Sequence, residues 1–119
     1  MFTVDSLIAG KDPVVQRIYD RLIDVLAGLG PIGQDAKKTS IHLTAGEGGT
    51  AFAGVHPRRA GILLNVRTSA PIESPRVRKL EQVSRSRFHN EILLNAPEEV
   101  DAELAGWLGE AYGLSKPAD

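Results

Sequence analysis

The sequence contains no cysteine and few aromatic residues, with one tryptophan, two tyrosines and three phenylalanines among 119 residues. The absence of cysteine excludes disulfides, thiolate metal sites and cysteine nucleophiles, and it suits a reducing cytosol. No apolar run approaches the roughly 20 residues of a membrane helix, and residues 1–5 lack the basic and apolar regions of a secretion signal. We therefore expect a cytoplasmic protein, without a membrane segment, that is stabilised by packing alone.

Charge is distributed unevenly along the chain, although the formal net charge is only −1 at pH 7. Residues 56–89 contain eight basic and two acidic residues, whereas residues 90–119 contain one basic and seven acidic residues. Two interpretations stay open. The two segments neutralise each other within one fold or between subunits, or the basic segment forms a surface for an anionic partner.

A first helix is predicted to begin at Pro13, with Asp12 as its N-cap. Apolar residues then recur at spacings of three and four, and Gly28 and Gly30 mark the end of the helix. Upstream, residues 4–9 favour a single short helical turn.

A second helix is predicted near the end of the chain. Asn95 is a suitable N-cap, and Glu98 stands three residues later in the capping-box position. An apolar stripe follows, made of Val100, Leu104, Trp107, Leu108 and Ala111. Tyr112 and Gly113 are expected to end this helix, and residues 114–119 are expected to fray.

Four segments alternate between apolar and polar residues, which is typical of half-buried strands. They cover residues 39–44, 50–56, 62–68 and 87–94. Short turns between the first three strands favour antiparallel pairing. We expect residues 33–38 to be a polar connection and residues 69–86 to be an irregular linker with one or two helical turns.

These elements predict a single α+β domain over residues 1–119, with residues 1–11 as an N-terminal segment. Its antiparallel sheet of about four strands is expected to carry the N-terminal and C-terminal helices on one face. The other face of the sheet then stays partly open.

No local motif indicates catalysis. The glycine-rich residues 46–49 lack the lysine and the following helix of a phosphate-binding loop, so they are interpreted as a turn. His42, His56 and His89 show no metal-binding spacing, and the serines have no nucleophile-elbow context. We therefore expect no metal, no cofactor and no catalytic triad.

The strand alternation instead indicates a surface. If the apolar residues face the helices, the opposite face gathers Ser40, His42, Thr44, Asn65, Arg67, Arg87, His89 and Glu91. The candidate ligand-binding residues are His42, Arg58, Arg59, Arg67, Arg87 and His89. Arg76, Arg78 and Lys79 could extend this cationic surface. The alternative is an ordinary solvated sheet face, with some of the arginines paired to the acidic final helix.

Several stretches together resemble a known bacterial family. They are residues 39–43, the run Phe52 to Pro57, the run Gly61 to Leu64, the run Pro75 to Lys79, and Phe88 with His89. The most specific pattern lies in the last helix, where Asp101, Glu103, Leu104, Trp107, Leu108, Glu110, Ala111 and Tyr112 recur at fixed spacing. The chain resembles the uncharacterised domain of unknown function 5655 over most of its length. The resemblance implies a small stand-alone protein or a domain attached to predicted nucleases, and it implies no reaction.

Three functional hypotheses follow. The leading one is a non-catalytic binding module whose cationic sheet face engages an anionic partner, either nucleic acid or a nucleotide-like ligand. The second is a homodimer in which the acidic helix of one copy meets the basic strands of the other. The third, least supported, is a small enzyme that uses His42 or His89 beside an arginine.

Overall fold

The computed structural model describes residues 2–116 and consists of one six-stranded sheet and a helical layer. The helices are α1 (Val4–Ile8), α2 (Pro13–Ala27) and α3 (Ala102–Ser115), and a short 3-10 helix, η1 (Pro97–Glu99), precedes α3. The strands are β1 (Gly33–Ala36), β2 (Ile41–Thr44), β3 (Ala51–Pro57), β4 (Ile62–Thr68), β5 (Val77–Ser84) and β6 (Arg87–Leu94). The α+β class and the antiparallel sheet are confirmed.

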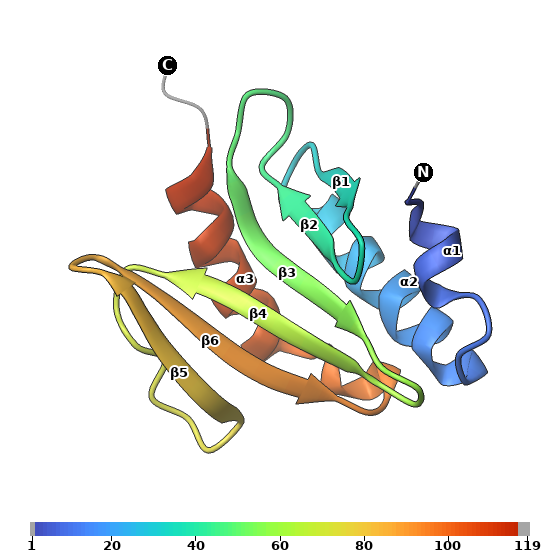
Figure 1. Ribbon diagram of the computed structural model, residues 1–119. Helices are drawn as coiled ribbons and strands as arrows, with labels where there is room; N and C mark the ends of the chain where they lie inside the picture. Colours follow the sequence, from blue (N-terminus) through green and yellow to red (C-terminus); the bar gives the residue numbers. More distant parts are fainter. Residues whose placement is uncertain (1, 117–119) are drawn as a thin grey trace.

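The sheet and the long helices form two layers. All neighbouring strands are antiparallel, in the order β1-β2-β3-β4-β6-β5. Figure 1 shows α2 and α3 behind the sheet and no helix in front of it, while α1 lies beside β1. The placement of both long helices on one face leaves the other face uncovered.

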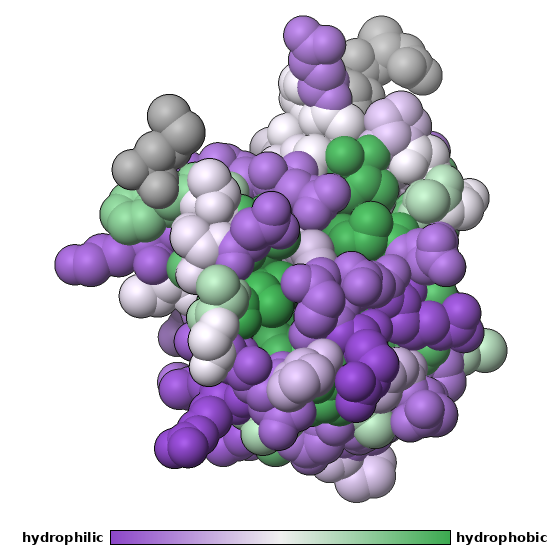
Figure 2. All heavy atoms as spheres, turned by 90° about the vertical axis from the view of Figure 1, so that its right-hand side faces the viewer, coloured by the Kyte–Doolittle hydropathy of each residue, from purple (hydrophilic) through white to green (hydrophobic). Residues whose placement is uncertain are grey.

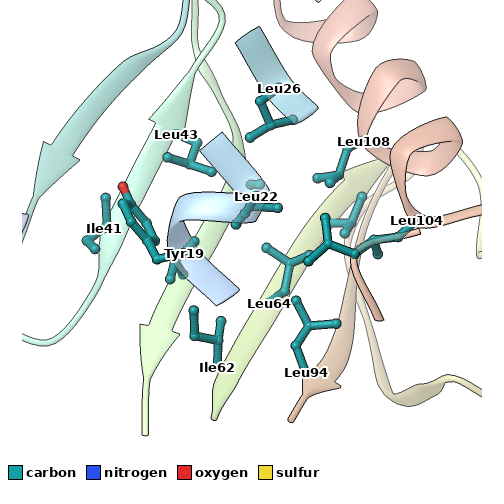
Figure 3. Packing of buried hydrophobic residues seen from close by; sticks show 14 of the residues in the cluster. Tyr19, Leu22, Leu26, Ile41, Leu43, Ile62, Leu64, Leu94, Leu104 and Leu108 are labelled. Atoms are coloured by element: carbon teal, nitrogen blue, oxygen red, sulfur yellow. The ribbon is translucent and has the colours of Figure 1, made fainter. Parts of the chain in front are cut away.

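The core lies between the sheet and the two long helices. Leu22 and Leu26 of α2 and Leu104 and Leu108 of α3 are fully buried, and they point toward the apolar residues of β2, β4 and β6 (Figure 3). The alternation of apolar and polar residues in the strands has therefore sorted the side chains between the two faces as the sequence predicts.

Helix α2 begins as predicted. Asp12 is its N-cap and accepts a hydrogen bond from the N–H of Val14, and proline occupies the first turn. Farther along, the buried hydroxyl of Tyr19 donates a 2.6 Å hydrogen bond to Oε1 of Gln34 on β1. Burial raises the pKa of Tyr19 far above its usual value, so this phenol remains a donor.

The sheet has six strands instead of about four, because two segments predicted as connections form its edges. Residues 33–36 pair with β2 as β1, and residues 77–84 pair with β6 as β5. The three-residue spacing of Val77, Leu80 and Val83 suggested helical turns, and this interpretation was wrong. Backbone pairing with β6 decides the structure here, and Leu80 and Val83 stay about half exposed on an edge strand.

The predicted cap of the last helix also needs correction. Asn95 precedes η1, and its N–H donates to the side chain of Glu99 at 2.7 Å. Asp101 is the N-cap of α3 and accepts a hydrogen bond from the N–H of Leu104. The helix then continues past the predicted end to Ser115, which is buried. Of the tail expected to fray, residues 117–119 lie outside the described residues.

A register shift in β2 opposite β3 changes the orientation of Phe52. Thr44 pairs with Ala51 and Leu43 pairs with Ala53, so Phe52 has no partner on β2. Its ring is buried against Tyr112 of α3, with 5.4 Å between ring centroids in an edge-to-face arrangement. The alternation of a regular strand, which would put Phe52 on the same face as Gly54 and His56, therefore fails at this bulge.

No helix within residues 2–116 is long and apolar enough to cross a membrane. Figure 2 shows the side that carries α1 and α2, where polar side chains cover most of the surface and apolar ones are visible in gaps between them.

Candidate functional site

The uncovered side of the sheet, here called the open face, displays most of the polar strand residues. Cross-strand pairing places Arg67 of β4 opposite His89 of β6, and Asn65 opposite Glu91. A continuous row crosses all six strands and consists of Asp35, His42, Gly54, Asn65, Glu91 and Lys79. The row brings polar groups of distant segments onto one surface.

Gly54 forms a low point in the middle of this row. A Cβ atom at this position would lie 3.7 Å from Cβ of Asn65 and 3.9 Å from Nε2 of His56. Glycine lacks that atom, and Gly54 is itself buried, so the side chains of its neighbours form the surface here. Oδ1 of Asn65 is buried beside Gly54 and has no hydrogen-bond partner within residues 2–116.

A hollow of about 230 Å³ opens at one end of the open face and is called the Arg67 hollow below. Thr50, Ala51, Arg67, Arg87 and His89 line it. Three of these residues were predicted as ligand-binding residues from the sequence, and the fold brings them together from β4 and β6.

Arg67 is a partly buried cation without a counterion in the described chain. Its Nη1 donates one long hydrogen bond, 3.4 Å, to the carbonyl oxygen of Ala51, and its buried Nε has no partner. No carboxylate within residues 2–116 lies within 4.0 Å of its guanidinium. Burial lowers the pKa of Arg67, and the positive charge of Arg87 lowers it further. Desolvation of this charge is therefore poorly compensated.

The histidines of the open face are held toward their neutral forms. Burial and the charge of Arg67 lower the pKa of His89, although Glu81 acts in the opposite direction. Burial and Arg67 also lower the pKa of His42, and burial and Arg58 lower that of His56. An anion bound among these groups would favour their protonated forms.

A second, larger hollow of about 610 Å³ lies at the other end of the open face and is called the lysine groove. Lys11, Lys38, His56, Arg58, Leu63 and Glu91 contribute to its lining. Its cations come from the α1–α2 loop, the β1–β2 turn and the β3–β4 turn. A backbone hydrogen bond from Asp12 to the carbonyl of Arg59 fixes the α1–α2 loop against the β3–β4 turn.

The remaining predicted site residues are spread over the surface. Arg58 and Arg59 are both exposed at the β3–β4 turn, and Arg58 lines the lysine groove whereas Arg59 lines neither hollow. His42 and His89 lie on β2 and β6 with β3 and β4 between them. Three strand spacings of about 4.8 Å separate the two histidines by roughly 14 Å, so both imidazoles cannot contact the same atom of a substrate.

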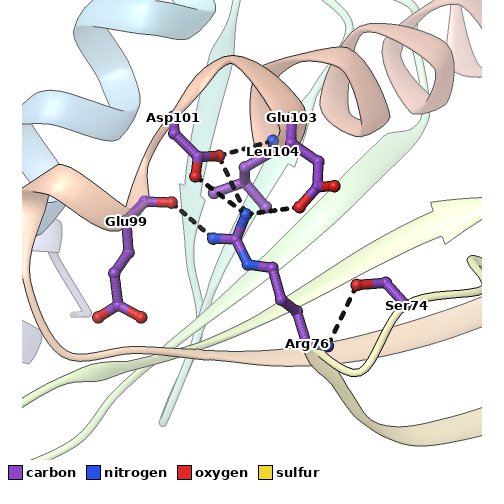
Figure 4. A network of polar contacts seen from close by, with 6 residues as sticks. All are labelled: Ser74, Arg76, Glu99, Asp101, Glu103 and Leu104. Carbon is purple, nitrogen blue, oxygen red and sulfur yellow. Dashed lines mark hydrogen bonds and ion pairs between the residues drawn. The ribbon is translucent and has the colours of Figure 1, made fainter.

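Arg76 does not extend the cationic surface as expected from the sequence. Its Nη1 contacts Asp101 at 3.0 Å and Glu103 at 3.1 Å, and its Nη2 donates to the carbonyl of Glu99 at 2.7 Å (Figure 4). Its guanidinium also lies over Trp107, 5.7 Å from the ring centroid. Arg76 therefore joins the start of β5 to the start of α3. This is the alternative that the sequence left open, in which some of the arginines pair with the acidic final helix.

Lys11, Lys38, His56 and Gly54 were not among the predicted site residues. The two lysines are distant in sequence from the basic segment, and only the fold brings them beside Arg58. Gly54 carried a usable signal, because a glycine inside a strand often marks a close backbone approach. Asn65 was correctly placed on the polar face, but the pattern gave no sign that its carbonyl oxygen is buried.

Within the described residues, no three histidine, aspartate or glutamate side chains are grouped so that they could hold a metal ion. A family model described as "Domain of unknown function (DUF5655)" matches residues 4–115 of the chain. No curated protein and no solved structure matches the sequence.

Proposed function

Because the chain belongs to the DUF5655 family, whose description carries no activity, we propose from its own surface that it is a binding module that holds an anionic group in the Arg67 hollow. The observation that carries the proposal is the uncompensated guanidinium of Arg67. A phosphate or carboxylate in the hollow would accept hydrogen bonds from the guanidinium and offset the desolvation of its charge.

Two neighbours support this assignment. Arg87 adds a second cation to the same hollow, and His89 can become cationic when an anion lowers the cost of protonation. A phosphate-bearing ligand, either nucleic acid or nucleotide-like, fits this set because arginine binds phosphate through two parallel hydrogen bonds. The absence of cysteine supports a cytoplasmic location, which is part of the proposal.

Fluorescence anisotropy with labelled single-stranded and double-stranded oligonucleotides tests the proposal. We expect binding at low salt that weakens as salt rises, because phosphate contacts release counterions. Arg67→Met roughly keeps the length of the side chain and removes the charge. It should weaken binding about tenfold or more, because a charge-assisted hydrogen bond contributes about 1.5–3 kcal/mol.

Arg21→Met is the matched control. Arg21 is exposed on α2, in the helical layer, and its loss changes the net charge by the same amount. The proposal predicts that Arg21→Met binds within about twofold of the unaltered protein, because surface charges contribute little to a distant site. Equal effects of the two substitutions would show that binding depends on total charge, and the Arg67 hollow would then lose its assignment.

A homodimer is the alternative function. Arg76 already pairs with the acidic start of α3 inside one chain, which leaves Glu98 and Glu110 as exposed acids for an intermolecular contact. Mass measurement in solution across salt concentrations separates the two functions, since a dimer held by charge should dissociate as salt rises.

A further inference from the structure

The lysine groove gives the open face a second cationic site. It shares no lining residue with the Arg67 hollow, and it lies toward the other end of β4. Leu63, in the groove, and Arg67, in the hollow, are four residues apart on that strand and face the same side. At about 3.3 Å per residue, the two sites are roughly 13 Å apart.

We propose that the open face binds one single strand of nucleic acid, whose backbone contacts the Arg67 hollow and the lysine groove while its bases lie over Gly54 between them. The inference rests on the proposed function of the Arg67 hollow. It adds the class of ligand, the path of that ligand along β4 on the open face, and a second binding site.

The separation of the two sites favours an extended ligand over a mononucleotide. A distance of roughly 13 Å spans about four nucleotides at the 3.4 Å or so per nucleotide of a stacked strand, and fewer if the strand is extended. One phosphate group cannot reach both the hollow and the groove.

The groove itself can accept a phosphate. Lys38 and Arg58 are exposed, and Lys11 is partly so, and none of the three has an ion-pair partner within residues 2–116. The carboxylate of Glu91 also lines the groove, but Nε of Arg78 lies 3.4 Å from it and offsets its charge. The groove therefore carries an excess of positive charge.

The surface between the two sites distinguishes nucleic acid from other polyanions. His42 and His56 lie beside the buried Gly54 on the open face, His56 exposed and His42 partly so, and planar rings of this kind stack on unpaired bases. A polyphosphate or polyglutamate offers no planar ring to stack on these imidazoles, and the bases of a duplex are already paired.

The test uses labelled thymidine and adenosine octanucleotides, with thymidine 5′-monophosphate as the short probe. Two double variants, each of which removes two positive charges, are compared. The groove variant combines Lys38→Gln and Arg58→Gln, and the α2 variant combines Arg17→Gln and Arg21→Gln. The groove variant should weaken octanucleotide binding about tenfold and reduce the salt slope by about 1.4, since each single-strand phosphate contact contributes about 0.7. Its affinity for the monophosphate at the Arg67 hollow, followed by the NMR shift of the Ala51 amide, should stay within twofold, and the α2 variant should match the unaltered protein.

The outcomes separate this inference from the proposed function. If Arg67→Met weakens binding of both probes and the groove variant behaves like the α2 variant, the two-site strand is wrong and the anion site stands. If Arg67→Met leaves both probes unaffected, or if neither probe binds at low salt, both proposals fall. Equal affinity for a DNA duplex or for polyglutamate of the same charge would overturn the assignment to single strands.

Discussion

Arg67 reaches from β4 to the carbonyl oxygen of Ala51 and donates to it a single hydrogen bond of 3.4 Å. The contact is long for an N–H donor, and Nε of the same guanidinium has no partner within the described chain. A cation in this position adds little to the stability of the fold. Its value is therefore expected to lie in binding, as is common for residues that carry a stability cost at functional sites.

Arg67→Met should leave the free energy of unfolding unchanged or raise it by up to about 1 kcal/mol. The substitution removes an uncompensated charge and keeps a side chain of similar length, and replacing poorly paired buried charges with apolar groups is often neutral or stabilising. Urea unfolding followed by the fluorescence of Trp107 measures this. A loss of more than about 1 kcal/mol would indicate that Arg67 supports the fold.

Anion binding should strengthen as the pH falls through and below about 6.5, the ordinary pKa of histidine. In the free protein, burial and Arg67 lower the pKa of His89, and a bound phosphate raises it again. Between these two pKa values binding takes up a proton, so affinity increases at lower pH. Titrations with the methyl ester of thymidine 5′-monophosphate at several pH values check this, because a phosphodiester, unlike a monoester with its second pKa of about 6, does not titrate in this range.

The matched variants for the pH experiment are His89→Gln, inside the Arg67 hollow, and His42→Gln, on β2 outside it. His89→Gln should flatten the pH dependence, whereas His42→Gln should retain it. If both variants keep the full dependence, the proton is taken up elsewhere, and His89 has no part in binding.

Arg76→Met should destabilise the protein by about 1–3 kcal/mol. It removes charge-assisted contacts to Asp101 and Glu103 and leaves the carbonyl of Glu99 without this donor. Arg78→Met is the comparison, because its ion pair with Glu91 lies at the surface and should contribute under about 1 kcal/mol. Chemical denaturation measures the free energy of unfolding of both variants. Equal losses would mean that the contacts of Arg76 stabilise the fold no more than the surface ion pair of Arg78.

The ionised carboxylate of Asp101 should stabilise the folded protein, and this contribution should be complete only above about pH 4. The N–H of Leu104 and then Arg76 lower the pKa of Asp101, so its contribution is complete above the unfolded value of about 3.9 and is lost as the pH falls through the folded value. Because the side chain is exposed, the contribution is at most about 0.5 kcal/mol. Asp101→Asn should be less stable at pH 7, and the difference should close toward pH 3. A constant difference would argue against an ionic role.

The sequence predicted the elements whose signals are local. The cap at Asp12 and the alternation around Arg67 and His89 were sufficient to place α2 and the inner strands and to sort the sheet faces. The edge strands β1 and β5 were missed because their pairing is decided by the exposed backbone of the neighbouring strand and their own side chains show no clear period.

The candidate site was predictable only in part, for the same reason. Alternation places Arg67, Arg87 and His89 on one face, and pairing of β4 with β6 then brings them together. Lys11 and Lys38 join Arg58 through loop packing that no local pattern encodes. Asn90 is a further example, because its buried amide donates to Val66 and Thr68 and accepts from Ile72, contacts that hold residues 69–72 against the sheet.

Anion binding in the Arg67 hollow is tested most directly by an NMR titration of the 15N-labelled protein with thymidine 5′-monophosphate, following the arginine Nε–H signals and the backbone amides. We expect saturable shifts of the Nε–H signals of Arg67 and Arg87 and of the amide of Ala51, with the signal of Arg21 unchanged. If Arg67 does not shift while the ligand binds elsewhere, or if no signal shifts at low salt, the Arg67 hollow is not an anion-binding site.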